Sequence, residues 1–564
     1  MNKDPSSSSS DVLIDLQDVF FQHAKDTYSR SLFWQLHKDP SLDGKFSLSG
    51  VSFRVHAGER VVVIGHNGSG KSTLLSIIAG KRLAKSGRVR ALGGRDPFQE
   101  TSLSGDIAFI GETWPPEAYF GCSVDRIASE APFPLRKAAL AEALHLRLDR
   151  PVDRMSTGEK RRVQILHGML RPAKVYLLDE CSTDLDIVER QTVLALVREE
   201  CVANGGCCLY ATHIMDRLDD WATHVLLMKD GRVVDFLAVK DISVSLEQLA
   251  LDFMLHPDAG EGEGFNGKRG ASPARDTKRG ALSILTSPEP FERYGKDGIP
   301  HDELQQWQDI FAESPSYVND QSPRLPFGAG DRGAEAIICS DLSFKEVFHH
   351  MNFSVYRGER VLLCGCNGSG KSTLLNMLGG KQYFNNASKA LQIMGKTCYD
   401  DMTFLSQVAY GGDWWTKAPR GEVYVREILS LNTRRAKWLC EVLAVNLDWE
   451  VSCISSGEQR RVQILLYLLE DKPVVLLDEA TADLDVNQRY ALLKFLYLES
   501  ACRGVTIVYA THIYSGLNGW ANVLILLDRT KRGVHAVRRA RDGDVIEIEY
   551  LTEELAKLKY EEKI

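Results

Sequence analysis

Short apolar runs of strand length recur along this chain, and several lead into glycine-rich loops or acidic residues. "ERVVVIG", ending at Gly65, and "ERVLLCG", ending at Gly365, are each followed by a polar loop and an apolar helical segment, "STLLSIIAG" or "STLLNMLGG". The runs "VYLLDE" and "VVLLDE" end in acidic pairs at 179–180 and 478–479. Strands that alternate with helices in this order predict α/β domains built on a mixed sheet.

The whole order of elements occurs twice. The loop "GHNGSGKST" recurs as "GCNGSGKST", which places Lys71 and Lys371 300 positions apart. Downstream, "MSTGEKRRVQIL" and "ISSGEQRRVQIL", the two LLDE runs and the two "YATHI" segments all keep an offset of 299, as do Trp221 and Trp520. Chance does not hold one register across so many elements, so the chain is a tandem duplication.

Composition separates the two copies. Residues 256–335 hold eight of the 19 prolines and glycine-rich runs such as "AGEGEGFNGKRGA". Such a segment cannot bury enough apolar surface to offset the entropy lost on ordering, which predicts a flexible linker. We therefore expect α/β domains at 11–255 and 336–564, preceded by a disordered tail at 1–10.

Length, charge and cysteine usage narrow the class of protein. The 564 residues, 44% of them hydrophobic, suffice for about two to four domain cores. The formal charge of −8 argues against binding nucleic acid by global charge alone. No run approaches the roughly 20 apolar residues that span a bilayer. The 12 cysteines lack CxxC spacing, which suits reduced thiols in a soluble cytoplasmic or nuclear protein better than a framework of disulfides.

The repeated loop has the GxxxxGK[ST] pattern of a phosphate-binding loop and lies between an apolar strand and an apolar helix in both copies. Its glycines let backbone N–H groups curl around phosphate oxygens, and the following helix N-terminus adds partial positive charge. The two lysines are expected to reach the outer phosphates. The expected ATP-binding residues are Gly65, His66, Asn67, Gly68, Ser69, Gly70, Lys71, Ser72 and Thr73, and Gly365, Cys366, Asn367, Gly368, Ser369, Gly370, Lys371, Ser372 and Thr373.

The acidic pairs predict the second half of each site. Asp179 and Asp478 end a buried strand and are expected to hold Mg²⁺, directly or through water, together with the hydroxyls of the loop serines. Glu180 and Glu479 follow at once and are expected to polarise the water that attacks the terminal phosphate. A positioned general base contributes on the order of 10²–10⁴ in rate.

Two further motifs supply polar groups near strand and helix ends. His213 and His512 follow the apolar runs "CCLYAT" and "TIVYAT" and are expected to contact the terminal phosphate and orient the attacking water. The segments "STGEKRRVQ" and "SSGEQRRVQ" stand just before helices, where hydroxyl and N–H groups bind a phosphate. The ATP-binding residues expected there are Ser156, Thr157 and Gly158, and Ser455, Ser456 and Gly457.

Phosphate loop, serine–glycine signature, LLDE strand, D-loop and histidine, in this order, resemble the ATP-binding cassette (ABC) ATPases over nearly all of both halves. The resemblance implies two P-loop nucleotide-binding domains, each a mixed sheet core with a helical subdomain, paired head to tail about a pseudo-twofold axis. It also implies hydrolysis of ATP to ADP and phosphate with Mg²⁺, each ATP lying between one phosphate loop and the other cassette's signature. One cassette alone would supply half of each site, which explains why the loop occurs twice.

The sequence departs from the ABC pattern at three places. In the signature, usually LSGGQ, the first glycine is replaced by Thr157 or Ser456, and the glutamine by Glu159 or Glu458. The aromatic residue that stacks on adenine is not obvious: its position falls near His23 in the first copy and near 346–348 in the second.

The third departure is at the Q-loop. By order along the chain, Glu112 and Asp413 occupy the usual glutamine position, where a carboxylate oxygen also suits Mg²⁺; Gln407 is a second candidate. The expected metal ligands are therefore Ser72, Glu112 and Asp179, and Ser372, Asp413 and Asp478.

The signature, "YATHI" and "DDWATHVLLMKDG" resemble most closely the small eukaryotic non-intrinsic ABC proteins, some associated with the yeast deadenylase and transcription-regulatory complex. That branch implies an ATP-driven clamp that regulates a protein or ribonucleoprotein complex. The alternative is the motor of a transporter whose membrane subunits are separate chains. A ribosome-associated translation factor fits less well, because the linker is rich in proline and glycine instead of being a basic helix.

Overall fold

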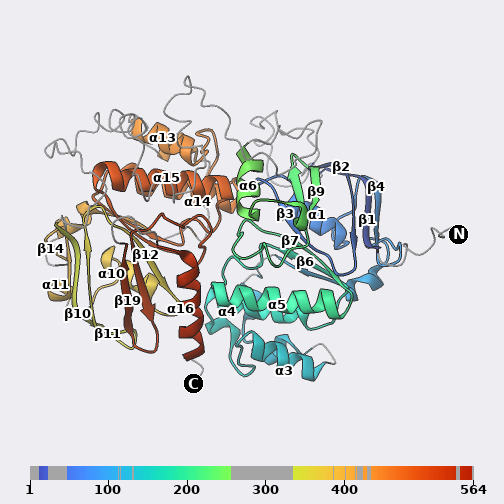
Figure 1. Cartoon of the computed structure of the whole chain (residues 1–564), viewed down its shortest axis with the longest axis horizontal. Helices are drawn as coiled ribbons and strands as arrows, with labels where there is room; N and C mark the ends of the chain where they lie inside the picture. Colours follow the sequence, from blue (N-terminus) through green and yellow to red (C-terminus); the bar gives the residue numbers. More distant parts are fainter. Residues whose placement is uncertain are drawn as a thin grey trace. The chain divides into compact units, whose positions relative to one another are not determined.

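Both halves of the repeat fold around a parallel sheet with one antiparallel edge strand. A computed structural model describes residues 12–22, 47–111, 114, 116–129, 133–255, 334–384, 387–399, 402–412, 415, 423–428, 434–540 and 546–561. The chain divides into two compact units, Met1–Ser272 (unit 1) and Pro273–Ile564 (unit 2), coloured blue to green and yellow to red in Figure 1. Each unit is described by itself.

Unit 1 contains a six-stranded and a three-stranded sheet. Its strands are β1 (Val12–Phe21), β2 (Leu48–His56), β3 (Arg60–Ile64), β4 (Ser86–Ala91), β5 (Ile107–Ile110), β6 (Val175–Asp179), β7 (Cys207–Ala211), β8 (His224–Lys229) and β9 (Arg232–Ala238). The larger sheet has the order β5-β6-β7-β3-β8-β9 and is parallel except for the β8–β9 pair. The smaller sheet, β2-β1-β4, is antiparallel.

Unit 1 has a helix between its sheets and a run of helices that follows the edge strand. They are α1 (Lys71–Ile78), α2 (Val124–Ile127), α3 (Pro134–Ala143), α4 (Thr157–Met169), α5 (Ile187–Ala203) and α6 (Leu246–Leu255). Helix α1 contacts β4 of the smaller sheet and β6 and β7 of the larger one, so it packs between the two sheets. Helices α2, α3 and α4 follow the edge strand β5 and form the helical part of the unit.

Unit 2 repeats this architecture. Its strands are β10 (Glu335–Phe344), β11 (Phe348–Tyr356), β12 (Arg360–Gly365), β13 (Leu391–Ile393), β14 (Lys396–Thr397), β15 (Val408–Gly411), β16 (Val474–Asp478), β17 (Thr506–Ala510), β18 (Val523–Asp528) and β19 (Gly533–Arg539). Its helices are α10 (Lys371–Leu378), α11 (Ala387–Ala390), α12 (Val425–Ile428), α13 (Arg434–Val442), α14 (Ser456–Leu469), α15 (Val486–Arg503) and α16 (Ile548–Glu561). The sheets have the orders β15-β16-β17-β12-β18-β19 and β11-β10-β13-β14.

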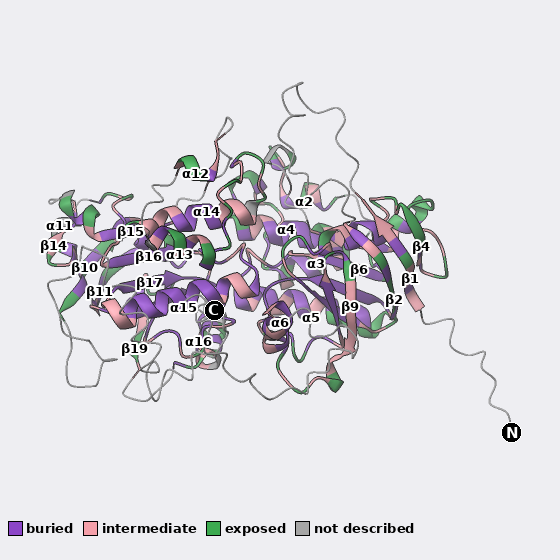
Figure 2. Ribbon diagram, turned by 90° about the horizontal axis from the view of Figure 1, so that it is seen from above, coloured by how far each residue is buried: buried purple, intermediate pink, exposed green. Residues whose placement is uncertain are grey.

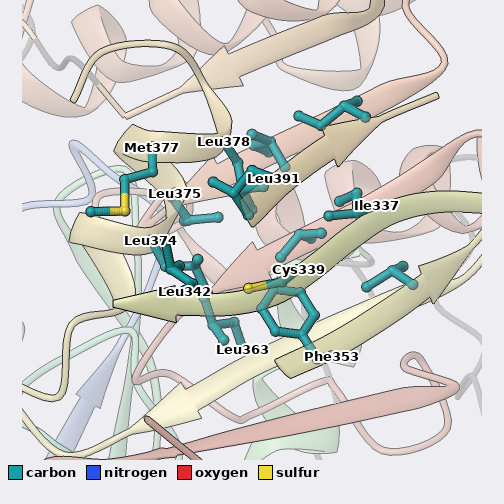
Figure 3. Packing of buried hydrophobic residues seen from close by; sticks show 14 of the residues in the cluster. Ile337, Cys339, Leu342, Phe353, Leu363, Leu374, Leu375, Met377, Leu378 and Leu391 are labelled. Carbon is teal, nitrogen blue, oxygen red and sulfur yellow. The ribbon is translucent and has the colours of Figure 1, made fainter. Parts of the chain in front are cut away.

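Each core lies between the two sheets of its unit. In unit 2, the buried face of α10 presents Leu374, Leu375 and Leu378 to residues of both sheets, among them Ile337 of β10 and Leu363 of β12 (Figure 3). Figure 2 shows the central strands and α15 as mostly buried, whereas β4 and the connecting loops are largely exposed. Near-continuous apolar runs form these central strands because parallel strands covered on both faces meet no water.

The topology brings the predicted motifs of each unit together. In unit 1, β6, β7 and β3 are parallel neighbours, so their carboxyl ends meet at one edge of the sheet. The loops that follow these three strands carry the acidic pair, the histidine and the phosphate loop, respectively. Ligands of open α/β sheets bind at this edge. The α/β fold with a mixed sheet and a helical part in each half is thus confirmed. Among the described residues, no helix has the length and apolarity needed to cross a bilayer.

Candidate active site

The lysine of each phosphate loop is held by the loop itself. Lys71 Nζ donates to the carbonyl oxygens of Gly65 at 2.7 Å and His66 at 3.0 Å. Lys371 Nζ donates to those of Gly365 at 2.7 Å and Cys366 at 3.2 Å. Both lysines are buried. The carbonyl groups of the loop therefore hold the lysine ammonium group in a fixed position, where it can bind an anion.

Glycine is required at particular points of this loop. Gly70 and Gly370 begin the helices α1 and α10 in the left-handed region, with φ of 101° and 98°. A Cβ at Gly65 would lie 2.4 Å from the backbone oxygen of Met228, so only glycine fits there without a shift. Gly70 and Gly370 are in a conformation that L side chains rarely adopt, and Gly65 has no room for a Cβ. Both constraints explain the glycine pattern of the loop sequence.

A serine and an aspartate meet beside the lysine in both units. Ser72 Oγ donates to Asp179 Oδ1 at 3.0 Å, and Ser372 hydrogen-bonds Asp478. Asp179 is half-buried, whereas Asp478 is 8% exposed. Burial raises the pKa of Asp478 to about 6, although the Ser372 hydrogen bond opposes the rise. In each unit, the serine hydroxyl and the aspartate carboxylate that the sequence predicts as magnesium ligands are therefore in contact.

The glutamate that follows each aspartate forms an ion pair with the histidine from the neighbouring strand. His213 Nδ1 lies 2.9 Å from Glu180 Oε2, and His512 Nδ1 lies 2.8 Å from Glu479 Oε1. Burial alone would raise the pKa of both carboxyls, but the histidine beside each outweighs it, and the phosphate-loop lysine adds to this, so both pKa values lie below the ordinary value. Both glutamates are therefore ionised, as a base must be.

The backbone of these glutamates is strained. Glu180 has φ of 47° and Glu479 has φ of 50°, the left-handed region that a residue with a Cβ seldom occupies. The N–H of each donates at 2.9 Å to the last residue of the neighbouring strand, Ala211 or Ala510. Strain of this kind, typically about 1–3 kcal/mol, persists only where the surroundings impose it.

The signature serines cap the helices that follow them. Ser156 is the N-cap of α4 and Ser455 is the N-cap of α14, each in a capping box with the glutamate three residues later. The departures Glu159 and Glu458 therefore have a structural role, because each carboxylate accepts from the backbone N–H and the hydroxyl of its own serine. Ser456 is the first residue of α14.

Arginines of the signature helices tie them to the D-loops. Arg161 Nε lies 3.5 Å from Asp184, and Arg460 Nε donates to Asp483 at 2.8 Å. Arg161 also donates to the carbonyl of Gly111 at 2.6 Å, just before the Q-loop position. The position of these arginines at the start of the signature helices predicts carboxylate partners, and the structure identifies those partners as Asp184 and Asp483. The two RR pairs and the two DLD segments repeat at one offset, which was the signal in the sequence.

Some expectations concern residues outside the described ones, among them the tail at 1–10 and the linker at 256–335 except for its last two residues, and one is changed by the structure. The metal ligands expected at Glu112 and Asp413 lie outside the described residues, and so does His23. Phe348 is fully buried in the core, and its ring lies where a Cβ on Gly370 would be. Its ring therefore cannot stack on a base in this structure.

Comparison with known proteins follows this geometry. The family model described as "ABC transporter" matches residues 48–183 and 348–482. The ABC transporter I family member 21 of Arabidopsis thaliana is 33% identical to this chain over 240 residues, which are 37% of this chain and 85% of that protein. The chain belongs to the ATP-binding cassette family. It is an ABC ATPase with two cassettes, one in each unit, and ABC ATPases hydrolyse ATP.

Other ABC proteins resemble single cassettes of the chain. The Arabidopsis thaliana ABC transporter I family member 20 is 35% identical over 213 residues, covering 34% of this chain and 65% of that protein. CCR4-associated factor 16 of Saccharomyces cerevisiae is 31% identical over 219 residues, covering 35% of this chain and 75% of that protein. The chain thus spans slightly under two thirds of the first and three quarters of the second.

One solved ABC structure matches along nearly the whole chain. The structure titled "RNase-L Inhibitor" has a TM-score of 0.59 and 19% sequence identity, and the match covers 96% of this chain and 93% of that one. At this identity the likeness supports the fold of two cassettes and nothing about partners.

Proposed function

We propose that the two cassettes of this chain pair with each other and hydrolyse ATP at two composite sites. The repeated Glu–His pair carries this proposal, since both units hold an ionised glutamate 2.8–2.9 Å from a histidine beside a phosphate-loop lysine. The first site combines Lys71, Ser72, Asp179, Glu180 and His213 with Ser455–Gly457. The second combines Lys371, Ser372, Asp478, Glu479 and His512 with Ser156–Gly158.

The proposed roles follow from the contacts. The lysine neutralises the outer phosphates, and the carboxylate of Glu180 or Glu479 accepts the proton of the attacking water. The histidine contacts the glutamate through Nδ1, and we assign its side chain the further role of contacting the terminal phosphate during hydrolysis. The phosphate loop and its helix N-terminus bind the remaining phosphate oxygens through backbone N–H groups.

The residues present fit Mg²⁺. Each unit offers a hydroxyl and a carboxylate in contact, which are hard oxygen ligands of the kind Mg²⁺ prefers. In unit 2 the carboxylate is buried and its pKa is raised to about 6, so a cation beside it would favour its ionised form. When bound with ATP, Mg²⁺ neutralises the charge that develops on the phosphate oxygens.

The output proposed for this hydrolysis is a clamp that regulates a protein or ribonucleoprotein complex, with cytoplasmic and nuclear locations both open to it. The similarity to CCR4-associated factor 16, at 31% identity, supports a link to a deadenylase or transcription-regulatory complex. The transporter motor is the second candidate, because the matching family model and the plant relatives carry the description "ABC transporter".

Affinity purification of a variant that closes on ATP without hydrolysing it separates these candidates. The double variant Glu180→Gln, Glu479→Gln would be purified with and without detergent and with and without ribonuclease, and its partners identified by mass spectrometry. The double variant Lys71→Ala, Lys371→Ala is the control that should not retain ATP. Deadenylase or transcription components enriched over the control support the clamp. Polytopic membrane proteins recovered only with detergent would replace it with the transporter motor.

A further inference from the structure

A tyrosine lies three residues before the histidine in both units, at the centre of the sheet. Tyr210 on β7 and Tyr509 on β17 are each 1% exposed. The Tyr210 hydroxyl hydrogen-bonds the hydroxyl of Ser182, and the Tyr509 hydroxyl lies 2.5 Å from that of Thr481. Ser182 and Thr481 come two residues after the glutamate in each copy. These tyrosines have no part in the site as described above.

The hydrogen bonds continue from each tyrosine to the histidine side. The hydroxyl of Tyr210 also bonds that of Thr212, and Tyr509 bonds Thr511 in the same way. The threonine hydroxyl in turn accepts from the N–H two residues on, at 3.1 Å in both units. A continuous chain of buried hydroxyls therefore links the segment after the glutamate to the turn that carries the histidine.

We propose that Tyr210 and Tyr509 are positioning residues for ATP hydrolysis, each holding the base glutamate and its histidine in register through the flanking hydroxyls. The inference rests on the roles proposed above for that pair. It assigns the tyrosines no contact with ATP.

The ring of each tyrosine is fixed, so its hydroxyl is a fixed point. Trp221 packs edge-on against Tyr210 with ring centroids 6.0 Å apart, and Trp520 packs against Tyr509 at 5.9 Å. Each indole N–H donates to a helix carbonyl, Leu194 of α5 at 2.7 Å or Leu493 of α15 at 2.9 Å. The two tryptophans that keep the repeat register thus anchor the tyrosines from behind.

The hydroxyl network around each tyrosine helps to maintain the strained backbone of the glutamate. A residue with φ near 50° relaxes unless its neighbours prevent it. The glutamate N–H donates to the carbonyl oxygen of Ala211 or Ala510, which fixes the backbone on its N-terminal side. The tyrosine hydroxyl bonds Ser182 or Thr481, which fixes the backbone two residues after the glutamate. Burial keeps the tyrosine neutral, raising the pKa of Tyr509 to about 12, so its hydroxyl remains a donor at physiological pH. Loss of that hydroxyl would leave two buried hydroxyls with one partner fewer.

The test compares removal of the hydroxyl at either end of the bond. One variant carries Tyr210→Phe and Tyr509→Phe, and a second carries Ser182→Ala and Thr481→Ala, which breaks the same bonds without touching the strands. A third exchanges the natural hydroxyl residues between copies, as Ser182→Thr and Thr481→Ser. Tyr176→Phe is the matched control, since Tyr176 is a buried tyrosine of β6 whose hydroxyl accepts from the Ala173 N–H at 3.2 Å.

Steady-state kcat and KM, ATP affinity and melting temperature are measured for every variant. We expect kcat to fall on the order of tenfold in the first and second variants, with KM and ATP affinity within about twofold, because misplacement of a reacting group lowers the chemical step. The exchange variant should keep kcat within about twofold. Combining the first two variants should lower kcat no further than either alone, since both break one network.

Other outcomes overturn the inference. If both variants keep the kcat of Tyr176→Phe, the tyrosines only fill the core. The same follows if KM rises and melting temperature drops in step with kcat, or if the exchange variant loses as much as the alanine variant. Glu180→Gln and Glu479→Gln are assayed alongside: if they retain kcat, the proposed base fails, and if only they lose it, the base stands and the positioning role fails.

Discussion

The nucleotide sites of unit 1 and unit 2 hold the Glu–His pair in nearly the same way but surround it differently. The distance from the histidine Nδ1 to the glutamate carboxylate is 2.9 Å in unit 1 and 2.8 Å in unit 2, and both glutamates have a strained backbone. The neighbouring aspartate, in contrast, is half-buried in unit 1 and buried in unit 2. What the two copies share is what the proposed chemistry requires, whereas the surroundings have diverged.

The signatures differ in the same manner. The capping glutamate of unit 1, Glu159, also accepts a hydrogen bond from Arg150. The corresponding position in unit 2 is Trp449, and Glu458 has only Arg461, at 3.8 Å, as an ion-pair partner among the described residues. The second signature thus carries a less compensated negative charge. The comparison predicts two sites with the same mechanism and different sensitivities to pH and charge.

The largest expected effect tests the shared part of the comparison. Glu180→Gln and Glu479→Gln should each lower turnover steeply, by about 10²–10⁴ at the altered site, because each removes a positioned base. Single-turnover hydrolysis of radiolabelled ATP by each variant measures this. A single variant with the turnover of the unaltered protein would mean that its site does not hydrolyse ATP, and the two copies would then differ in chemistry as well.

The buried aspartate of unit 2 should reduce stability at neutral pH. Burial raises the pKa of Asp478 from 3.8 to about 6, so the folded ligand-free protein resists ionisation of this carboxyl. Its contribution to the free energy of unfolding is therefore largest below about pH 4, falls as pH rises from about 4 to about 6, and stays low above that. Asp478→Asn should therefore raise the melting temperature at pH 7.5 by a few degrees, at about 2–4 °C per kcal/mol.

The gain should shrink as pH is lowered below 6, where Asp478 itself is protonated. Scanning calorimetry of ligand-free protein from pH 5 to 8 measures both variants Asp478→Asn and Asp179→Asn. The second is the matched control, and its half-buried side chain should give a smaller change. Equal gains at both positions, or a gain that does not depend on pH, would mean that burial does not distinguish the two sites.

The signature glutamates should affect ATP affinity unequally. If each signature meets the nucleotide bound by the other cassette, a carboxylate there repels the triphosphate, and two unit charges at 4 Å in water interact by about 1 kcal/mol. Glu458→Gln should therefore improve ATP affinity by up to about fivefold, and Glu159→Gln by less, since Arg150 already offsets that charge. Glutamine retains the capping geometry, so the melting temperature checks that only charge has changed.

Equilibrium binding of a fluorescent ATP analogue to the hydrolysis-deficient protein measures these affinities. Arg150→Ala should make Glu159→Gln as effective as Glu458→Gln. If Glu159→Gln and Glu458→Gln improve ATP affinity equally while Arg150 is present, the two signatures do not differ in effective charge.

The smallest effect concerns the second residue of each phosphate loop. His66 Nε2 lies 3.0 Å from the carbonyl of Met254 on α6, whereas Cys366 Sγ makes a weak contact with Leu555 of α16 at 3.9 Å. His66→Ala should lower the free energy of unfolding by about 1 kcal/mol, the usual net value of such a bond, and Cys366→Ala by less. Thermal unfolding measures both, and a larger loss for Cys366→Ala would contradict the prediction.

Much of the fold was readable from the sequence because it depends on local patterns. The apolar runs before Gly65 and Asp179 form the parallel strands β3 and β6, and the glycines at 70 and 370 stand where φ is positive. Motif order then indicated the ABC family, and offsets of 300 for the phosphate loop and 299 for the later motifs showed that the set is duplicated. The helix start at Ser156 was also predictable, because serine followed three residues later by glutamate is a capping signal.

Contacts between distant segments could not be read in this way. Nothing near Tyr210 in the sequence indicates Ser182 as its partner, and the repeated RR and DLD segments do not by themselves identify Asp184 or Gly111 as partners of Arg161. The burial that raises the pKa of Asp478 depends on tertiary packing around the end of β16, which the residue's own sequence neighbours do not reveal. Similarly, Phe348 lay close to the expected base-stacking position, but the register of β10 with β11 buries it in the core.

The sequence by itself therefore determined the duplication, the two α/β units and which residues are the candidates for binding phosphate and Mg²⁺. These follow from periodicity, spacing and side-chain chemistry, which are properties of a linear chain. Only the tertiary structure decided that the glutamate is strained and paired with the histidine of a neighbouring strand, and that the signature glutamates cap their helices. It also decided that a buried tyrosine hydrogen-bonds hydroxyl residues near both members of the Glu–His pair. Those features arise from parallel strands whose ends meet at one edge of a sheet, where residues far apart in sequence come within hydrogen-bonding distance.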